Sequence, residues 1–186
     1  MFNTNKGKIL LHLARAAIAK ELGFKSHDFP LIDWLEEPGA TFVTLTLQGQ
    51  LRGCIGSLEA YRPLIEDLQR NAVASAFRDP RFPPLSKEEF AEVAIEVSLL
   101  SKPELIRHNS EEDALAQLTP GRDGVIIQLG PQRATYLPQV WAQLPEPESF
   151  IAHLKEKAGL PEDFWSDDIQ LSHYTVQKWQ EIEPNG

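Results

Sequence analysis

Apolar and polar residues follow a helical period at the start of the chain. Leu10 and Leu13 belong to an apolar series over residues 6–22, and Gly23 follows where a helix would end. Residues 41–47 instead alternate apolar and hydroxyl-bearing side chains and are rich in β-branched residues. The pattern therefore predicts an N-terminal helix, then a loop, then a strand.

The rest of the chain mixes both kinds of element. LRGCIG at residues 51–56 is predicted to be the returning strand of a hairpin with Gly49 in its turn. The other predicted elements are a helix at 63–77, a short helix opened by a capping box at 86–89, a strand at 93–100, a helix at 110–118, a hairpin of 125–129 with 133–137, a helix at 148–158 and an extended segment at 169–176. This order favours an α+β fold, with a mostly antiparallel sheet and hairpins packed by helices.

The first hairpin determines which side chains share a face. A three-residue turn ending at Gly49 would place Leu45 opposite Leu51 and Thr44 opposite Arg52. Because side chains alternate along a strand, one apolar face would carry Val43, Leu45, Leu51 and Ile55. The other face would carry Phe42, Thr44, Thr46, Arg52 and Cys54.

Cys54 is the only cysteine and a candidate for chemistry. Arg52, at about 7 Å between Cα atoms, would favour a thiolate there. Gly53 and Gly56 would let a ligand or another backbone approach closely. The alternative is that Cys54 is a small buried residue and that the glycines form a bulge.

The loop RDPRF at residues 78–82 carries further candidates. An aspartate–arginine pair there either locks the loop, or Asp79 or Arg81 faces a cleft and orients a polar ligand. In the strand at 93–100, Glu96 alternates with apolar neighbours, so it is either solvated or paired with an arginine. The residue pattern leaves these alternatives open.

Composition and charge narrow the classes of function. With 27 acidic and 18 basic residues, the net charge of −9 argues against a nucleic-acid surface built on general basicity. A single cysteine excludes an internal disulfide, an iron–sulfur cluster and a cysteine-rich zinc site within the chain. Neither a signal-peptide pattern nor an uncharged run of about 18 residues is present. We therefore expect a cytoplasmic protein that makes no membrane contact.

Metal and cofactor motifs are not apparent in the sequence. The five histidines show neither HxxxH nor HxH spacing; they are His12, His27, His108, His153 and His173. Glycine-rich phosphate loops are also missing. We therefore expect no metal and no cofactor.

The chain resembles the AMMECR-type domain family, whose prokaryotic members are called AmmeMemoRadiSam system protein A. The segments that carry the resemblance run in the family's order from residue 39 onward and are GATFVTLTLQGQLRGCIGSLE, RDPRFPPL, EVSLLSKPELI, DGVII, YLPQVW and KAGL. LRGCIG is specific for this family. The resemblance implies one AMMECR-type domain over residues 1–186, with two unequal lobes, the larger containing both termini.

The resemblance also implies a shared functional surface, composed of Arg52, Gly53, Cys54, Gly56, Asp79, Pro80, Arg81 and Phe82. Family members are often encoded with a Memo-like protein and a radical-SAM protein, which suggests a common pathway and these two proteins as partners. One cysteine cannot hold a radical-SAM cluster, so this chain is not that component.

Two functions remain open at this point. We favour the binding of a small polar or anionic ligand or a partner peptide in a cleft near LRGCIG. The reason is that the sequence shows no complete set of catalytic residues. Its candidate residues are Arg52, Gly53, Gly56, Asp79, Arg81, Phe82 and Glu96. In the alternative, Cys54 is the nucleophile or thiol carrier of an enzyme and Arg52 binds an anion. Single-stranded nucleic acid, bound through Phe42 and Phe82, is disfavoured by the acidic balance.

Overall fold

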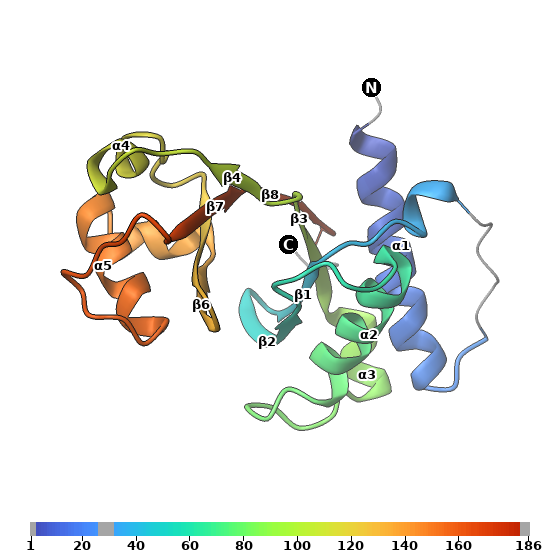
Figure 1. The fold of residues 1–186 in the computed structure, drawn as a ribbon. Coiled ribbons are helices and arrows are strands. Elements are labelled where there is room, and N and C mark those ends of the chain that lie inside the picture. The colour runs from blue at the N-terminus through green and yellow to red at the C-terminus, as the bar shows by residue number, and fades with distance from the viewer. Residues whose placement is uncertain (1–2, 26–31, 183–186) are drawn as a thin grey trace. The chain divides into compact units, whose positions relative to one another are not determined.

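The computed structural model describes residues 3–25 and 32–182, and His27 lies outside them. Within these residues the chain forms two four-stranded sheets with helices, which confirms the α+β prediction (Figure 1). By its contacts the chain divides into two compact units, residues 1–100 with 177–186, and residues 101–176. The second unit is therefore inserted, in sequence, between two parts of the first.

The first unit holds a sheet with the strand order β2-β1-β3-β8. Its elements are α1 (Asn3–Glu21), the 3-10 helix η1 (Asp33–Leu35), β1 (Thr41–Leu47), β2 (Gln50–Gly56), α2 (Leu64–Phe77), α3 (Lys87–Glu92), β3 (Ala94–Leu100) and β8 (Val176–Gln180). Helix α2 packs on β1 and β2, and α1 packs on β3 and beside α2 (Figure 1). The two long helices therefore cover one face of this sheet.

Alternation along β1 and β3 builds the core of the first unit. Val43 and Leu45 of β1 are fully buried, as are Ile95 and Val97 of β3. They pack against the apolar side of α2, where Leu68 is also fully buried. The apolar side of α2 and the predicted apolar face of the strand thus meet in one hydrophobic cluster.

The turn between β1 and β2 differs from the expected one. Leu47 pairs with Gln50, so the turn contains two residues, Gln48 with φ 51° and Gly49 with φ 73°. Two successive positive φ values are typical of a type I′ turn, whose twist matches that of the strands it joins. The prediction of a three-residue turn is therefore wrong.

A β-bulge in β2 then changes the register. Leu45 pairs with Gly53 and Thr46 with Leu51, so Arg52 is one extra residue opposite this step. The expected pairs of Leu45 with Leu51 and of Thr44 with Arg52 are wrong. Leu51 lies on the face of Thr46 instead of the apolar face, and 44% of it is exposed.

The second unit holds an antiparallel sheet with the order β4-β7-β5-β6. Its elements are β4 (Glu104–Ile106), α4 (Glu111–Ala116), β5 (Gly124–Leu129), β6 (Gln132–Tyr136), the 3-10 helix η2 (Pro138–Ala142), α5 (Pro147–Lys157) and β7 (Gln170–Tyr174). Trp141 and Phe150 stack at 3.7 Å between ring centroids in its core. The predicted hairpin and both predicted helices are present in this unit.

Candidate functional site

Cys54 lies in the edge strand β2, directly opposite Thr44 of β1. Its side chain is half-buried, and its Sγ accepts a hydrogen bond from Thr44 Oγ1 at 3.3 Å. On its other side Thr44 pairs with Glu96 of β3, so these three residues form a row across one face of the sheet. Glu96 is paired with Lys178 at 3.5 Å, so its partner is a lysine and not an arginine.

Arg52 is occupied by contacts within the chain. Its buried guanidinium donates from Nε and Nη2 to the two carboxylate oxygens of Glu89, at 2.8 and 2.9 Å. Nη2 also donates to the main-chain oxygen of Pro83 at 3.0 Å. Hydrogen bonding from Arg52 lowers the pKa of Glu89. Arg52 thus fastens α3 and the preceding loop to β2, a role that the sequence did not indicate.

The two glycines of LRGCIG are packed against the chain itself. A Cβ atom at Gly53 would lie 2.1 Å from the main-chain oxygen of Ser75 in α2. A Cβ atom at Gly56 would lie 2.2 Å from the ring of Phe42, its partner in β1. The sequence left open the close approach of a ligand or of another backbone; at Gly53 it is the backbone of α2, whereas at Gly56 the neighbour is an aromatic side chain.

The loop 78–84 covers the outer edge of β2 at Cys54. The Cys54 N–H donates to Asp79 Oδ2 at 3.0 Å, and Arg81 Nη2 approaches the Cys54 oxygen at 3.4 Å. Asp79 is buried, and Arg81 holds it through Nε at 2.9 Å and Nη2 at 2.7 Å. Backbone groups that a neighbouring strand would use are therefore bound by side chains, which protects an edge strand from pairing with other chains.

This edge contact makes an acid-dependent contribution to stability. Hydrogen bonding from Arg81, together with the Cys54 N–H, holds the pKa of Asp79 far below its usual range. A carboxyl with a depressed folded-state pKa stabilises the fold above its unfolded pKa of about 3.9, and this contribution is lost as the pH falls further. We expect the free energy of unfolding, measured by urea denaturation, to decrease between about pH 5 and pH 2.

Asp79→Asn should flatten that pH dependence because the side chain no longer titrates. Asp168→Asn, which changes an exposed aspartate, serves as the matched control and should leave the slope unchanged. Equal slopes for the wild type and Asp79→Asn would contradict the assignment.

Phe82 lies beside both arginines of the candidate surface. Its ring centroid is 5.8 Å from Cζ of Arg52 and 5.5 Å from Cζ of Arg81. Arg52 is buried, whereas 54% of the Arg81 side chain is exposed. The structure therefore brings together Cys54, Asp79, Arg81 and Phe82 and leaves Arg81 as the exposed cation of this group.

Sequence reasoning missed a second polar cluster next to β2. Asp67 of α2 is fully buried, and one of its oxygens accepts from Thr41 N and Oγ1, both at 2.8 Å. The other accepts from Ser57 Oγ at 2.6 Å and from Arg62 Nε at 2.8 Å. No local pattern distinguishes Asp67 from an ordinary acidic residue in the first turn of a helix, so the sequence carried no signal for it.

Among residues 3–25 and 32–182, no three His, Cys, Asp or Glu side chains are grouped so as to hold a metal ion. No helix in the same residues is both long enough and apolar enough to cross a membrane.

The fold and site define a class: an α+β protein whose LRGCIG strand is an edge strand covered by an Asp-Pro-Arg loop. The AMMECR1 family model matches residues 11–179, and the chain belongs to the AMMECR1 family.

Proteins similar to this chain include archaeal relatives of nearly the same length. Protein MJ0810 of Methanocaldococcus jannaschii is 37% identical over 193 residues, covering 100% of this chain and 95% of the relative. Protein MK0488 of Methanopyrus kandleri is 36% identical over 192 residues, covering 97% and 91%. The crystal structure of the uncharacterized protein PH0010 from Pyrococcus horikoshii has a TM-score of 0.74 and 37% identity, covering 97% of this chain and 93% of that one.

Proposed function

We propose that the protein binds a small polar or anionic ligand at the surface around Cys54 and Arg81. The observation that carries the proposal is the state of Arg81. Its guanidinium is held at a fixed orientation by buried Asp79, while more than half of the side chain remains exposed. A preoriented, accessible guanidinium binds carboxylate or phosphate oxygens with little loss of conformational entropy.

The neighbouring groups support a polar ligand of small size. Phe82 offers an aromatic ring beside Arg81, and the Cys54 thiol and Thr44 hydroxyl lie in the adjoining strands. Arg81 forms no hydrogen bond from Nη1 to any described residue, so this N–H group can donate to an oxygen of the ligand. The ion pair with Asp79 neutralises much of the positive charge of Arg81, so we expect the affinity for an anionic ligand to be modest.

The sequence favoured Arg52 as a ligand-binding residue, but this proposal gives it a structural role. Because its guanidinium is buried against Glu89 and Pro83, we propose that it positions the loop and does not contact the ligand. The link to Memo-like and radical-SAM proteins remains part of the proposal. This link rests on the family resemblance. If the three proteins share a pathway, the natural ligand is a metabolite of that pathway.

The test is a titration followed by backbone amide NMR, with inorganic phosphate and succinate as probes. We expect saturable shifts of the Cys54 and Arg81 amides in the wild type, loss of about tenfold in affinity in Arg81→Ala, and unchanged affinity in Cys54→Ala. Arg70→Ala, which removes an exposed arginine of α2, is the matched control. Shifts that are absent at these two amides, or equal affinity in Arg81→Ala, would refute the proposal.

A different variant, Thr44→Val, addresses the alternative, a cysteine-dependent enzyme. The hydrogen bond from Thr44 Oγ1 to Cys54 Sγ favours it, because the hydroxyl holds the sulfur in one orientation on the half-buried face of β2. In that case alkylation of Cys54 by iodoacetamide should slow markedly in Thr44→Val. Rates that are equal in the two proteins, and no faster than those of an unperturbed thiol, would leave ligand binding as the better description.

A further inference from the structure

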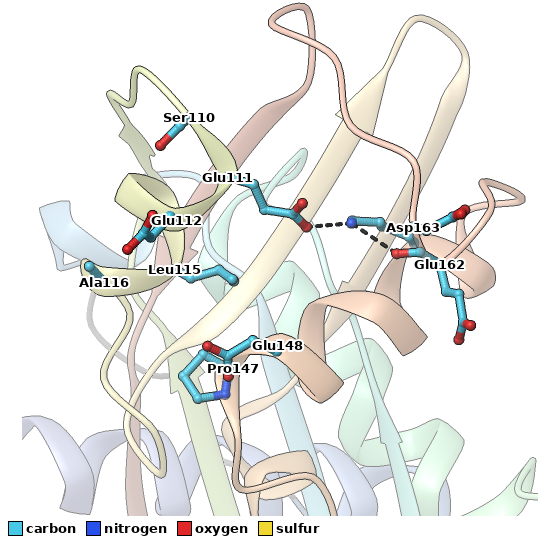
Figure 2. A pocket seen from close by; sticks show the side chains of 10 residues that line it. Ser110, Glu111, Glu112, Leu115, Ala116, Pro147, Glu148, Glu162 and Asp163 are labelled. Atoms are coloured by element: carbon cyan, nitrogen blue, oxygen red, sulfur yellow. Dashed lines mark hydrogen bonds and ion pairs between the residues drawn. The ribbon is translucent and has the colours of Figure 1, made fainter.

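A hollow of about 800 Å³ lies in the second unit between α4, the start of α5 and residues 162–163 (Figure 2). Its cation is Lys155, whose side chain is 2% exposed. The ammonium group of Lys155 already donates to the carboxylate of Glu111 and to the main-chain oxygen of Glu162 (Figure 2). This cation is therefore occupied, unlike the exposed Arg81 of the first unit, which keeps an unpaired nitrogen among the described residues.

The guanidinium of Arg81 presents that one nitrogen, Nη1, to a ligand. Nε and Nη2 both donate to Asp79, and Nη2 also lies 3.4 Å from the main-chain oxygen of Cys54. Arginine binds a carboxylate most strongly when two of its nitrogens donate in parallel to the two oxygens. At Arg81 the pair of nitrogens Nε and Nη2 is already used in this way by Asp79. Nη1 therefore suits a single oxygen acceptor, and nothing in its geometry requires that acceptor to be a carboxylate.

The two arginines beside Phe82 both have a carboxylate partner. Asp79 is buried, and hydrogen bonding from Arg81 holds its pKa far below its usual range, so this carboxylate is ionised at neutral pH. Arg52 is paired with Glu89 in the same manner. The two ion pairs carry no net charge, and the chain as a whole has a formal charge of −9. An anionic ligand would therefore lose hydration without meeting a net positive charge.

The loop that carries Arg81 also offers apolar surface. Phe82 is half-buried, and its ring centroid lies 5.5 Å from Cζ of Arg81. The prolines of the same loop, Pro80, Pro83 and Pro84, are exposed. Covering such surface is favourable whatever the charge of the ligand. A small inorganic anion at Nη1 would leave this surface in water, whereas a ligand with a carbon frame would cover part of it.

We propose that the ligand of this surface is an uncharged carboxamide with a hydrophobic frame. Its carbonyl oxygen accepts a hydrogen bond from Arg81 Nη1, and its frame packs against Phe82. A carboxamide oxygen is a strong acceptor, but its removal from water is less unfavourable than that of a carboxylate. This inference rests on the proposed function, because it names the chemical class of the ligand for the same surface. Phosphate and small carboxylates then bind there less tightly than a carboxamide.

Benzamide and benzoate are suitable probes because they differ in charge but hardly in size and shape. The full chain is titrated with each at about pH 7, where only benzoate is charged, and the backbone amides of Cys54 and Arg81 are followed by NMR. We expect an affinity about fivefold higher for benzamide. Phe82→Leu should weaken the binding of benzamide about threefold, since the aromatic contact is lost. Phe164→Leu changes an exposed aromatic residue of the second unit and should have no effect.

Asp79→Asn tests the role of charge directly. The substitution leaves the guanidinium of Arg81 without a carboxylate, so the preference should reverse and benzoate should bind more tightly than benzamide. Asp168→Asn makes the same change in net charge at an exposed residue of the second unit and should retain the preference for benzamide.

The inference is overturned if benzoate binds the wild type as tightly as benzamide does, or if Asp79→Asn keeps the preference of the wild type. Phosphate and succinate shifts at the two amides without any benzamide shifts would also overturn it, and would leave the proposed function standing. Absence of shifts with all four compounds would refute the proposed function and the inference together.

Discussion

Gly53→Ala should destabilise the first unit by about 3 kcal/mol, because adding a methyl group to a packed interface without space is strongly unfavourable. The new Cβ would lie 2.1 Å from the main-chain oxygen of Ser75. A carbonyl within α2 cannot rotate away as a side chain can, so either the helix or β2 must shift. Urea denaturation followed by circular dichroism measures the effect.

Two controls separate the clash from a general effect on the hairpin. Gln50→Ala changes an exposed residue at the start of the same strand and should alter stability by less than about 0.5 kcal/mol. Ser75→Ala should not relieve the clash, because the main-chain oxygen remains. A Gly53→Ala protein as stable as the wild type would mean that α2 and β2 leave room for a methyl group at this position.

Asp67→Ala should cost about 3–5 kcal/mol, the range found when one partner of a buried ion pair is removed. The substitution leaves Arg62 without its carboxylate and removes the acceptor of the Thr41 N–H, the Thr41 hydroxyl and the Ser57 hydroxyl. Each unpaired buried donor adds its own desolvation penalty. Because β1, the end of β2 and α2 all meet at this carboxylate, we expect loss of cooperative unfolding of the first unit.

Asp67→Asn is the informative companion variant. It keeps one oxygen acceptor and removes the charge, so its effect should fall between those of wild type and Asp67→Ala. Glu66→Ala removes the neighbouring carboxylate, which is 43% exposed and forms an ion pair with Arg70, and should change stability by less than about 1 kcal/mol. Similar losses in Asp67→Ala and Glu66→Ala would contradict the role assigned to the buried cluster.

The site could be predicted in part because alternation in β1 is a local property. Val43 and Leu45 face the helices, and Cys54 shares a face of the sheet with Thr44, as expected, although Arg52 was the expected partner of Thr44. The prediction of the face on which Cys54 lies was nevertheless correct only because two errors in the predicted hairpin offset each other. The turn is one residue shorter than expected, and the bulge at Arg52 adds one residue, so the register beyond the bulge returns to the predicted parity.

Other contacts could not be predicted because the partners are distant in sequence. The capping box of α3 was recognised, but nothing in it indicates that Glu89 also binds Arg52, 37 residues earlier. Strand β8 was missed because VQKWQ has too few apolar residues to indicate a strand, and β4 was missed because it has three residues. Lys178 of β8 therefore could not be foreseen as the partner of Glu96.

The place of β8 in the first sheet has a consequence for how the protein is made. Residues 101–176 form a contiguous segment, so the second unit has its whole sequence available as soon as β7 has been synthesised. The first unit begins earlier but lacks one of its four strands until residue 180 has been added. Domains generally fold as units during synthesis. The unit that begins first on the ribosome is therefore the one that is completed last.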